Sequence, residues 1–222
     1  MKDVVYRPRI WIGLFVINII LFFFTAWSVK THRKYVQYID QIIIKLSRGH
    51  ITDIKTSFAL VITHLGDYHF CLTMTIIISI VLFFLRQYFT AITFLLGFIG
   101  ARCCRSLLKY MLYRPRPNHI HLVPASDGSF PSGHMIYSVF FYGAILFFVI
   151  YILIKNGQLS KTWLGMIPAL LMVILIGWSR IYLGVHYPTD IIGGFFIGTS
   201  WLSLVLSFYI AVKKRFAPKL SK

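Results

Sequence analysis

The chain has 222 residues, of which 58% are hydrophobic and only 13% are charged, and its mean hydropathy is +0.74. This composition excludes an ordinary water-soluble globular domain and predicts a membrane protein. Its 23 Lys and Arg residues outnumber 6 acidic residues, all of them Asp, and the formal net charge is +17. Because no nucleic-acid-binding motif accompanies this charge, we attribute it to anionic lipid headgroups and expect no nucleic-acid partner.

Six apolar runs are long enough to cross the ~30 Å hydrocarbon core of a bilayer. They lie at about 10–28, 68–85, 88–108, 135–154, 163–183 and 191–212. We therefore predict an all-α polytopic membrane protein, with six transmembrane helices in one bundle and a single membrane-embedded domain over residues 1–222. The first run is too long for the apolar region of a signal peptide and is expected to be retained.

The distribution of basic residues predicts the orientation of the bundle. Six spans put both termini on one side, and Lys2, Arg7, Arg9 and the basic tail 213–222 indicate that this side is cytoplasmic. One group of basic residues opposes this topology, because it falls on the outer side. Its members are Lys30, Arg33, Lys34, Lys45, Arg48 and Lys55.

The segment between the first two spans has an amphipathic pattern. Its apolar residues recur at helical spacing, with polar residues between them: Tyr35, Ile39, Ile42, Ile43 and Leu46. The pattern predicts a helix that either lies in the headgroup plane or packs on the rim of the bundle with a solvated outer face.

Three short motifs carry nearly all the polar chemistry of the remaining chain. They are KYMLYRPRP at 109–117, FPSGH at 130–134 and SRIYLGVHYPTD at 179–190. The predicted topology places all three on the outer side, so we expect them to meet at one face of the bundle.

Cations of the first and third motifs and the helix start of the second suit a phosphate group. Lys109, Arg116 and Arg180 are cations, and the planar guanidinium of Arg matches phosphate oxygens. Ser132 and Gly133 stand where a helix is expected to begin, and the unpaired N–H groups there favour an anion.

The third motif suits a nucleophile. Pro188 is expected in the first turn of the last helix, which places His186 just before that helix and Asp190 within its first turn. The carboxylate can then orient one ring nitrogen of His186 and leave the other free for attack. His134 remains available to protonate a leaving oxygen, and the combination predicts phosphoryl transfer.

Each of these residues also has a purely structural interpretation. Arg180 and Asp190 would form a buried ion pair between helices. Lys109, Arg114 and Arg116 would be interfacial anchors, and a histidine at the interface needs no chemistry. The conjunction of all of them favours a catalytic site.

The three motifs together resemble the signature of the type 2 phosphatidic acid phosphatase family, which reads K-x6-RP, PSGH and SR-x5-H-x3-D. Every position is matched, and the positions are Lys109, Arg116, Pro117, Pro131, Ser132, Gly133, His134, Ser179, Arg180, His186 and Asp190. The resemblance implies hydrolysis of a phosphate ester through a phosphohistidine on His186, with Asp190 orienting it and His134 protonating the leaving group. It also implies the residues that hold the phosphate: Lys109, Arg116, Ser132, Gly133 and Arg180.

We expect no metal and no other cofactor, because the chain has no Glu and Asp190 is the only carboxylate in the three motifs. His119 and His121 form an H-x-H pair that lacks an evident third zinc ligand, which favours loop polarity over a zinc site. Asp127 and Asp67 are interpreted as turn residues, with an alternative role at the entrance of the site.

A site at the membrane face predicts an amphiphilic substrate whose tails stay in the surrounding membrane lipids. The expected substrate is a lipid phosphate: phosphatidylglycerophosphate, phosphatidate or undecaprenyl pyrophosphate. The alternative is a protein that binds or transports a lipid phosphate without cleaving it. The similar vanadate haloperoxidases are not built from membrane spans, and the apolar content argues against them. The expected location is the cell membrane, with the active site on the extracytoplasmic face, and no feature indicates an oligomeric state.

Overall fold

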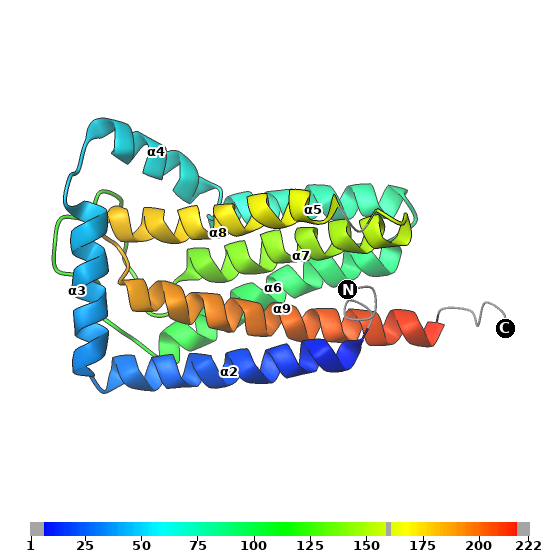
Figure 1. Ribbon diagram of the computed structural model, residues 1–222, viewed down its shortest axis with the longest axis horizontal. Helices are drawn as coiled ribbons and strands as arrows, with labels where there is room; N and C mark the ends of the chain where they lie inside the picture. The colour runs from blue at the N-terminus through cyan, green and yellow to red at the C-terminus, as the bar shows by residue number, and fades with distance from the viewer. Residues whose placement is uncertain (1–6, 159–160, 217–222) are drawn as a thin grey trace.

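The computed structural model describes residues 7–158 and 161–216, and in these residues all regular secondary structure is helical. Figure 1 shows the eight helices found there. They are α2 (Pro8–Lys30), α3 (Lys34–Arg48), α4 (Asp53–His64), α5 (Tyr68–Phe84), α6 (Tyr88–Met111), α7 (Gly133–Lys155), α8 (Trp163–Tyr182) and α9 (Pro188–Phe216).

The predicted fold class is confirmed. In the described residues, α2, α6, α7, α8 and α9 are each long and apolar enough to cross a membrane. The remaining expected span, 68–85, corresponds to α5, which has 17 residues. With α4 it forms a pair, bent by 44°, that passes the same test jointly. The described part of the chain therefore has five such helices, or six if the bent pair counts as one span.

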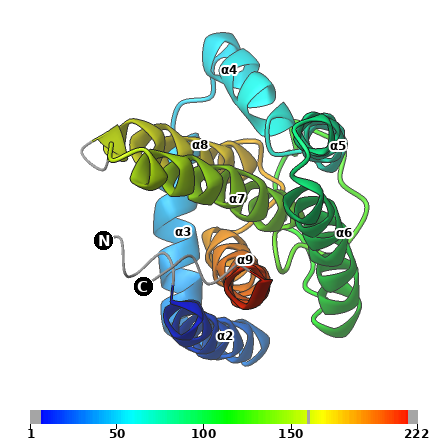
Figure 2. The same ribbon diagram turned by 90° about the vertical axis from the view of Figure 1, so that its right-hand side faces the viewer.

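The helices pack around two central ones, α7 and α9 (Figure 2). Helix α7 contacts α9, α8, α6 and α5, and α9 also contacts α2, α3, α6 and α8. Aromatic rings fill the space between them: Phe94 and Phe98 of α6 stack or tilt against Phe140 of α7. A Cβ on Gly97 would lie 2.5 Å from the Phe140 ring, so this glycine allows the close approach of α6 and α7. Small residues commonly permit such contacts between membrane helices, where no hydrophobic effect drives association.

The amphipathic helix α3 lies across one end of the bundle (Figure 1) and contacts α8 and α9. It buries Val36 and Asp40, whereas the apolar stripe of Tyr35, Ile39, Ile42 and Leu46 stays exposed. The helix thus packs on the bundle, as expected for a helix on its rim. It also leaves an apolar face exposed, as expected for a helix in the headgroup plane.

Local sequence signals bring the motifs to this same end. Gly184 adopts a φ of +82°, a conformation that favours glycine, and it ends α8 so that the chain turns back toward His186. Pro188 opens α9, where its missing N–H has no helical partner to lose. A Cβ on Gly194 would lie 2.7 Å from the Ser132 oxygen, so the start of α7 sits directly against α9.

Candidate active site

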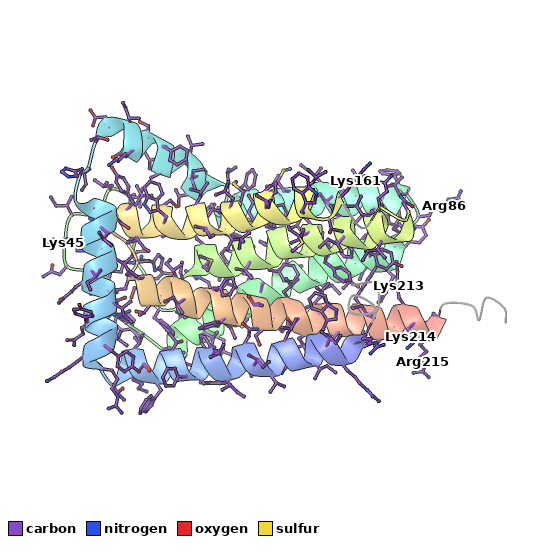
Figure 3. All side chains as sticks on the ribbon, in the orientation of Figure 1. Lys45, Arg86, Lys161, Lys213, Lys214 and Arg215 are labelled. Atoms are coloured by element: carbon purple, nitrogen blue, oxygen red, sulfur yellow. The ribbon has the colours of Figure 1, made fainter. Side chains whose placement is uncertain are left out.

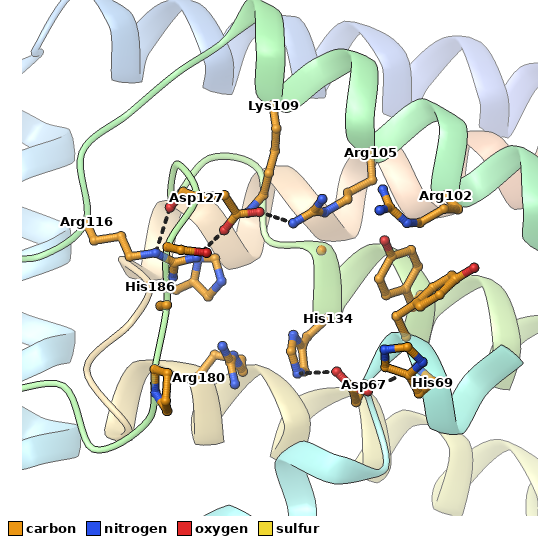
Figure 4. A pocket seen from close by; sticks show the side chains of 16 residues that line it. Asp67, His69, Arg102, Arg105, Lys109, Arg116, Asp127, His134, Arg180 and His186 are labelled. Atoms are coloured by element: carbon orange, nitrogen blue, oxygen red, sulfur yellow. Dashed lines mark hydrogen bonds and ion pairs between the residues drawn. The ribbon is translucent and has the colours of Figure 1, made fainter. Parts of the chain in front are cut away.

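The end of α6, the start of α7 and the turn between α8 and α9 surround a cavity of about 330 Å³ (Figure 4). Six of the sequence-predicted site residues line it: Lys109, Arg116, Gly133, His134, Arg180 and His186. Ser132 and Asp190 are fully buried behind its wall. The structure therefore brings the three motifs together, as the topology predicted.

His186 lies in the cavity wall beside the carboxylate of Asp190. Its Nδ1 atom is 3.5 Å from Asp190 Oδ2, and its side chain is only 2% exposed. Burial, and then the nearby Arg180 and Arg116, lower the pKa of His186 well below its ordinary value. The ring is consequently neutral at neutral pH and retains a lone pair.

Asp190 is held in place by three groups. Its Oδ2 accepts a hydrogen bond from the Tyr187 N–H at 2.8 Å, and its Oδ1 accepts one from Arg114 Nη1 at 2.8 Å. Its backbone oxygen accepts from the Ser132 N–H at 3.1 Å, which ties the start of α9 to the start of α7. The carboxylate thus cannot rotate freely beside His186.

The start of α7 presents His134 to the cavity. Ser132 precedes the helix and Gly133 is its first residue, as the sequence predicted. A Cβ on Gly133 would lie 2.9 Å from Arg105 Nε, so any larger residue would displace that guanidinium. His134 Nε2 is 3.8 Å from Asp67 Oδ1. Asp67 also accepts a hydrogen bond from the His69 N–H at the start of α5, so it is both a cap and a cavity residue.

Asp127 is more than the turn residue that the sequence suggested. Its carboxylate pairs with Lys109 Nζ at 2.9 Å, with Arg116 Nη2 at 2.6 Å and with Arg105. Burial alone would raise the pKa of Asp127, but the hydrogen bond and charge of Lys109, followed by Arg105 and Arg116, hold it below its usual range. The cations expected to hold phosphate therefore already surround a carboxylate.

The proposed ion pair between Arg180 and Asp190 is wrong for the described structure. Arg180 instead donates from Nη1 to Thr63 Oγ1 of α4 at 2.9 Å, and Asp190 pairs with Arg114. Arg180 is 6% exposed, and its Nε has no hydrogen-bond partner among the described residues. Its guanidinium is therefore fixed at one edge and open to the cavity at another.

Sequence reasoning missed a buried network behind His186. Arg114, interpreted as an interfacial anchor, bridges Asp190 and Asp40 at 2.8 Å each. Asp40 of α3 also accepts from the N–H and the hydroxyl of Thr189, both at 2.9 Å. The available signal was the single Asp in α3, four residues after the buried Val36 and hence on its packed face.

Two arginines of α6 were also missed. Arg102 and Arg105 line the cavity together with Lys109. Their separations of three and four residues put all three on one face of the helix, which is a signal that the sequence contained.

His119 and His121 stand apart from this cavity. His121 Nε2 lies 2.9 Å from the Pro117 oxygen, within its own loop. Among residues 7–158 and 161–216, no three His, Cys, Asp or Glu side chains are grouped so that they could hold a metal ion.

Comparisons with known proteins show the family to which the chain is similar. The family model described as the PAP2 superfamily matches residues 90–214, a range that contains all three motifs. Phosphatidylglycerophosphatase B of Bacillus subtilis is 33% identical over 196 residues, which cover 86% of this chain and 94% of the relative. An undecaprenyl-diphosphatase of Sulfolobus acidocaldarius is 29% identical over 57% of this chain and 58% of its own.

The structure also resembles a solved one. The crystal structure of a transmembrane PAP2 type phosphatidylglycerolphosphate phosphatase from Bacillus subtilis aligns with a TM-score of 0.75 at 30% identity. The alignment covers 97% of this chain and 100% of that one, so the likeness includes α2 to α5, outside the range matched by the family model.

Proposed function

Because the chain belongs to the PAP2 superfamily, it is a multi-pass membrane phosphoric ester hydrolase that acts on lipid phosphates, and we propose that His186 is its nucleophile. The observation that carries this proposal is a buried imidazole that lines a cationic cavity, with its Nδ1 3.5 Å from the fixed Asp190 carboxylate. Such a ring is oriented for attack through Nε2.

The proposed reaction has two steps. His186 Nε2 attacks phosphorus, the bond to the leaving oxygen breaks, and His134 gives that oxygen a proton. A water molecule then attacks phosphorus and gives a proton to His134, the bond between phosphorus and His186 Nε2 breaks, and inorganic phosphate leaves. Asp67 Oδ1 lies 3.8 Å from His134 Nε2, so its carboxylate can orient the ring that gives and takes the proton.

The phosphate oxygens are proposed to lie among Lys109, Arg116 and Arg180, with the N–H groups at Ser132 and Gly133 completing the site. Charge-assisted hydrogen bonds from fixed donors stabilise the additional charge of the transition state. The donor set is cationic and offers no group of carboxylates to a metal, which supports a reaction without one.

The proposed substrates are those for which the relatives are named, phosphatidylglycerophosphate and undecaprenyl diphosphate. We place the site on the extracytoplasmic face. Basic residues gather at the opposite end of the bundle (Figure 3), among them Arg86, Lys161 and Lys213. Arg48 lies at the same end as the site, and its charge there opposes this orientation. Its guanidinium donates hydrogen bonds to the backbone oxygens of Tyr182 and Ile120, so this residue also stabilises the fold.

The decisive experiment measures phosphate release in EDTA by purified wild type, His186→Ala and the matched control His50→Ala, whose histidine is exposed and does not line the cavity. Each variant is offered phosphatidylglycerophosphate, undecaprenyl diphosphate and phosphatidate in detergent. We expect wild type and His50→Ala to release phosphate and His186→Ala to release none. With a substrate labelled in its terminal phosphate, we expect wild type to form an acid-labile, labelled phosphohistidine.

Phosphate release by His186→Ala at the rate of wild type would disprove the assignment of His186 as the nucleophile. A wild type that binds the lipids and releases no phosphate would instead indicate a binding or transport protein.

A further inference from the structure

The cavity contains more positive charge than one phosphate group requires. Among the described residues that line it, five are Lys or Arg and two are Asp. Lys109, Arg116 and Arg180 suffice for the scissile phosphate, which leaves Arg102 and Arg105 without an assigned role. A cavity of about 330 Å³ also has room for a larger headgroup than a single phosphate.

The two extra arginines lie deeper in the bundle than the phosphate site. Arg102 is seven residues before Lys109 on α6, which places it about 10 Å along the helix toward the middle of the span. Figure 4 shows Lys109, Arg105 and Arg102 in a row along one wall, with His134 and Asp67 on the opposite wall. The cavity therefore extends from His186 into the membrane-embedded part of the protein.

The polar contacts of these arginines leave donors free. Arg105 shares Asp127 with two other cations, and its buried Nε has no hydrogen-bond partner in the part of the chain that the structure describes. Arg102 contacts the hydroxyl of Ser106 and the Tyr68 ring, 5.3 Å from the ring centroid, and forms no ion pair with a described residue. Charged groups at membrane depth are costly unless they are paired, so they mark ligand sites.

We propose that Arg102 and Arg105 form a second anion subsite, which binds a phosphate located between the scissile phosphate and the lipid tail. This inference rests on the proposed function, since it needs the scissile phosphate at His186. The tail must stay in the bilayer, so the linking part of the headgroup lies on the deeper side of the cavity. There the second phosphate of a lipid with two phosphates would contact the two guanidinium groups. A lipid with one phosphate has no anion to place beside them.

The subsite therefore assigns a substrate class. Phosphatidylglycerophosphate carries a phosphodiester between its glycerolipid and its terminal phosphate, and a prenyl diphosphate carries a second phosphate next to the first. Phosphatidate carries neither. The enzyme is accordingly built for lipids with two phosphates, and discriminates against lipid monophosphates by charge rather than by tail.

The test compares kcat/KM of wild type, Arg102→Gln, Arg102→Lys and the control Arg86→Gln, whose arginine lies at the opposite end of the bundle (Figure 3). The substrates are phosphatidylglycerophosphate, undecaprenyl diphosphate and phosphatidate in the same detergent. Loss of a hydrogen-bonded charge should lower kcat/KM of Arg102→Gln on the two diphosphorylated lipids about tenfold or more. Phosphatidate hydrolysis should stay unchanged, and Arg102→Lys should retain part of the preference.

An equal loss on all three lipids would overturn the subsite and leave the hydrolase standing, whereas no release by wild type from any lipid would overturn the proposed function itself. A second measurement uses wild type alone and so does not depend on how a variant folds. Methylenediphosphonate should inhibit phosphatidate hydrolysis at a concentration about tenfold or more below that of inorganic phosphate. Equal potency would also overturn the subsite.

Discussion

Two clusters of arginine and aspartate lie at the same end of the bundle and differ in exposure. In the open cluster, Asp127 sits on a loop among Arg105, Lys109 and Arg116, and its side chain is 42% exposed. In the buried cluster, Arg114 lies between Asp40 and Asp190, whose side chains are 3% and 0% exposed. Water reaches the carboxylate of the first cluster, whereas both carboxylates of the second are shielded from it.

The difference separates binding from positioning. A carboxylate on a solvated loop can yield its cations to an incoming phosphate, which carries more charge and more oxygens. The buried carboxylates belong to two packed helices, Asp40 to α3 and Asp190 to α9, and Arg114 holds both of them in place. Through Thr189 and Arg114, α3 thus holds the carboxylate beside the proposed nucleophile, although α3 lies outside the range that the family model matches.

The largest effect is expected for Arg114→Gln. It leaves two buried carboxylates without a cation, and breaking a buried ion pair in this way destabilises a protein by about 3–5 kcal/mol. Thermal unfolding in detergent micelles measures the loss. Arg105→Gln is the matched change in the open cluster and should cost on the order of 1 kcal/mol or less. Similar losses for both variants would remove the distinction between the clusters.

Asp40→Asn tests positioning without removing the side chain. The single amide oxygen can still accept from the Thr189 N–H, but the NH2 group then faces Arg114 and the bond to the guanidinium is lost, so Asp190 is held less firmly. We expect kcat to fall about tenfold, which corresponds to one charge-assisted hydrogen bond, with KM unchanged. Asp53→Asn, at the exposed start of α4, serves as the control. A rise in KM at constant kcat would assign Asp40 to substrate binding instead.

Arg116→Gln tests whether the open cluster acts on His186. Arg116 is one of the cations that lower the pKa of His186, and the protonated ring cannot attack. Removing the cation stabilises the imidazolium, so the acidic limb of the pH profile of kcat/KM should move to higher pH. The pH profile of Arg86→Gln should match that of wild type. A limb that stays in place would mean that Arg116 contributes to binding alone.

The smallest effect is expected for Asp127→Asn. The change frees Lys109 and Arg116 from a competing carboxylate, so inorganic phosphate should inhibit severalfold more strongly, as an inhibition constant measures. Ser126→Ala, its neighbour in the cavity lining, controls for disturbance of the loop. Weaker inhibition by phosphate would show that Asp127 arranges the cations rather than competing for them.

Much of the molecule could be predicted from the sequence. The bilayer sets the length of an apolar span, so hydropathy located α2, α6, α7, α8 and α9, and the start of α7 at Gly133 followed from the Ser-Gly pair. The span at 68–85 was predicted and corresponds to α5, whereas α4 and its bend against α5 were not predicted, because that break depends on how α4 packs against α8 and α5 against α7.

The sequence by itself determined which residues are available for phosphate chemistry, because their identity and spacing are local properties. Only the tertiary structure decided the pairing of the charges. Arg114 binds Asp190 and Asp40 from 76 and 74 residues away, and Arg180 turns to Thr63 instead of Asp190. The energy of an ion pair depends on a separation of a few ångströms and on exclusion of water, and both arise only when the helices pack.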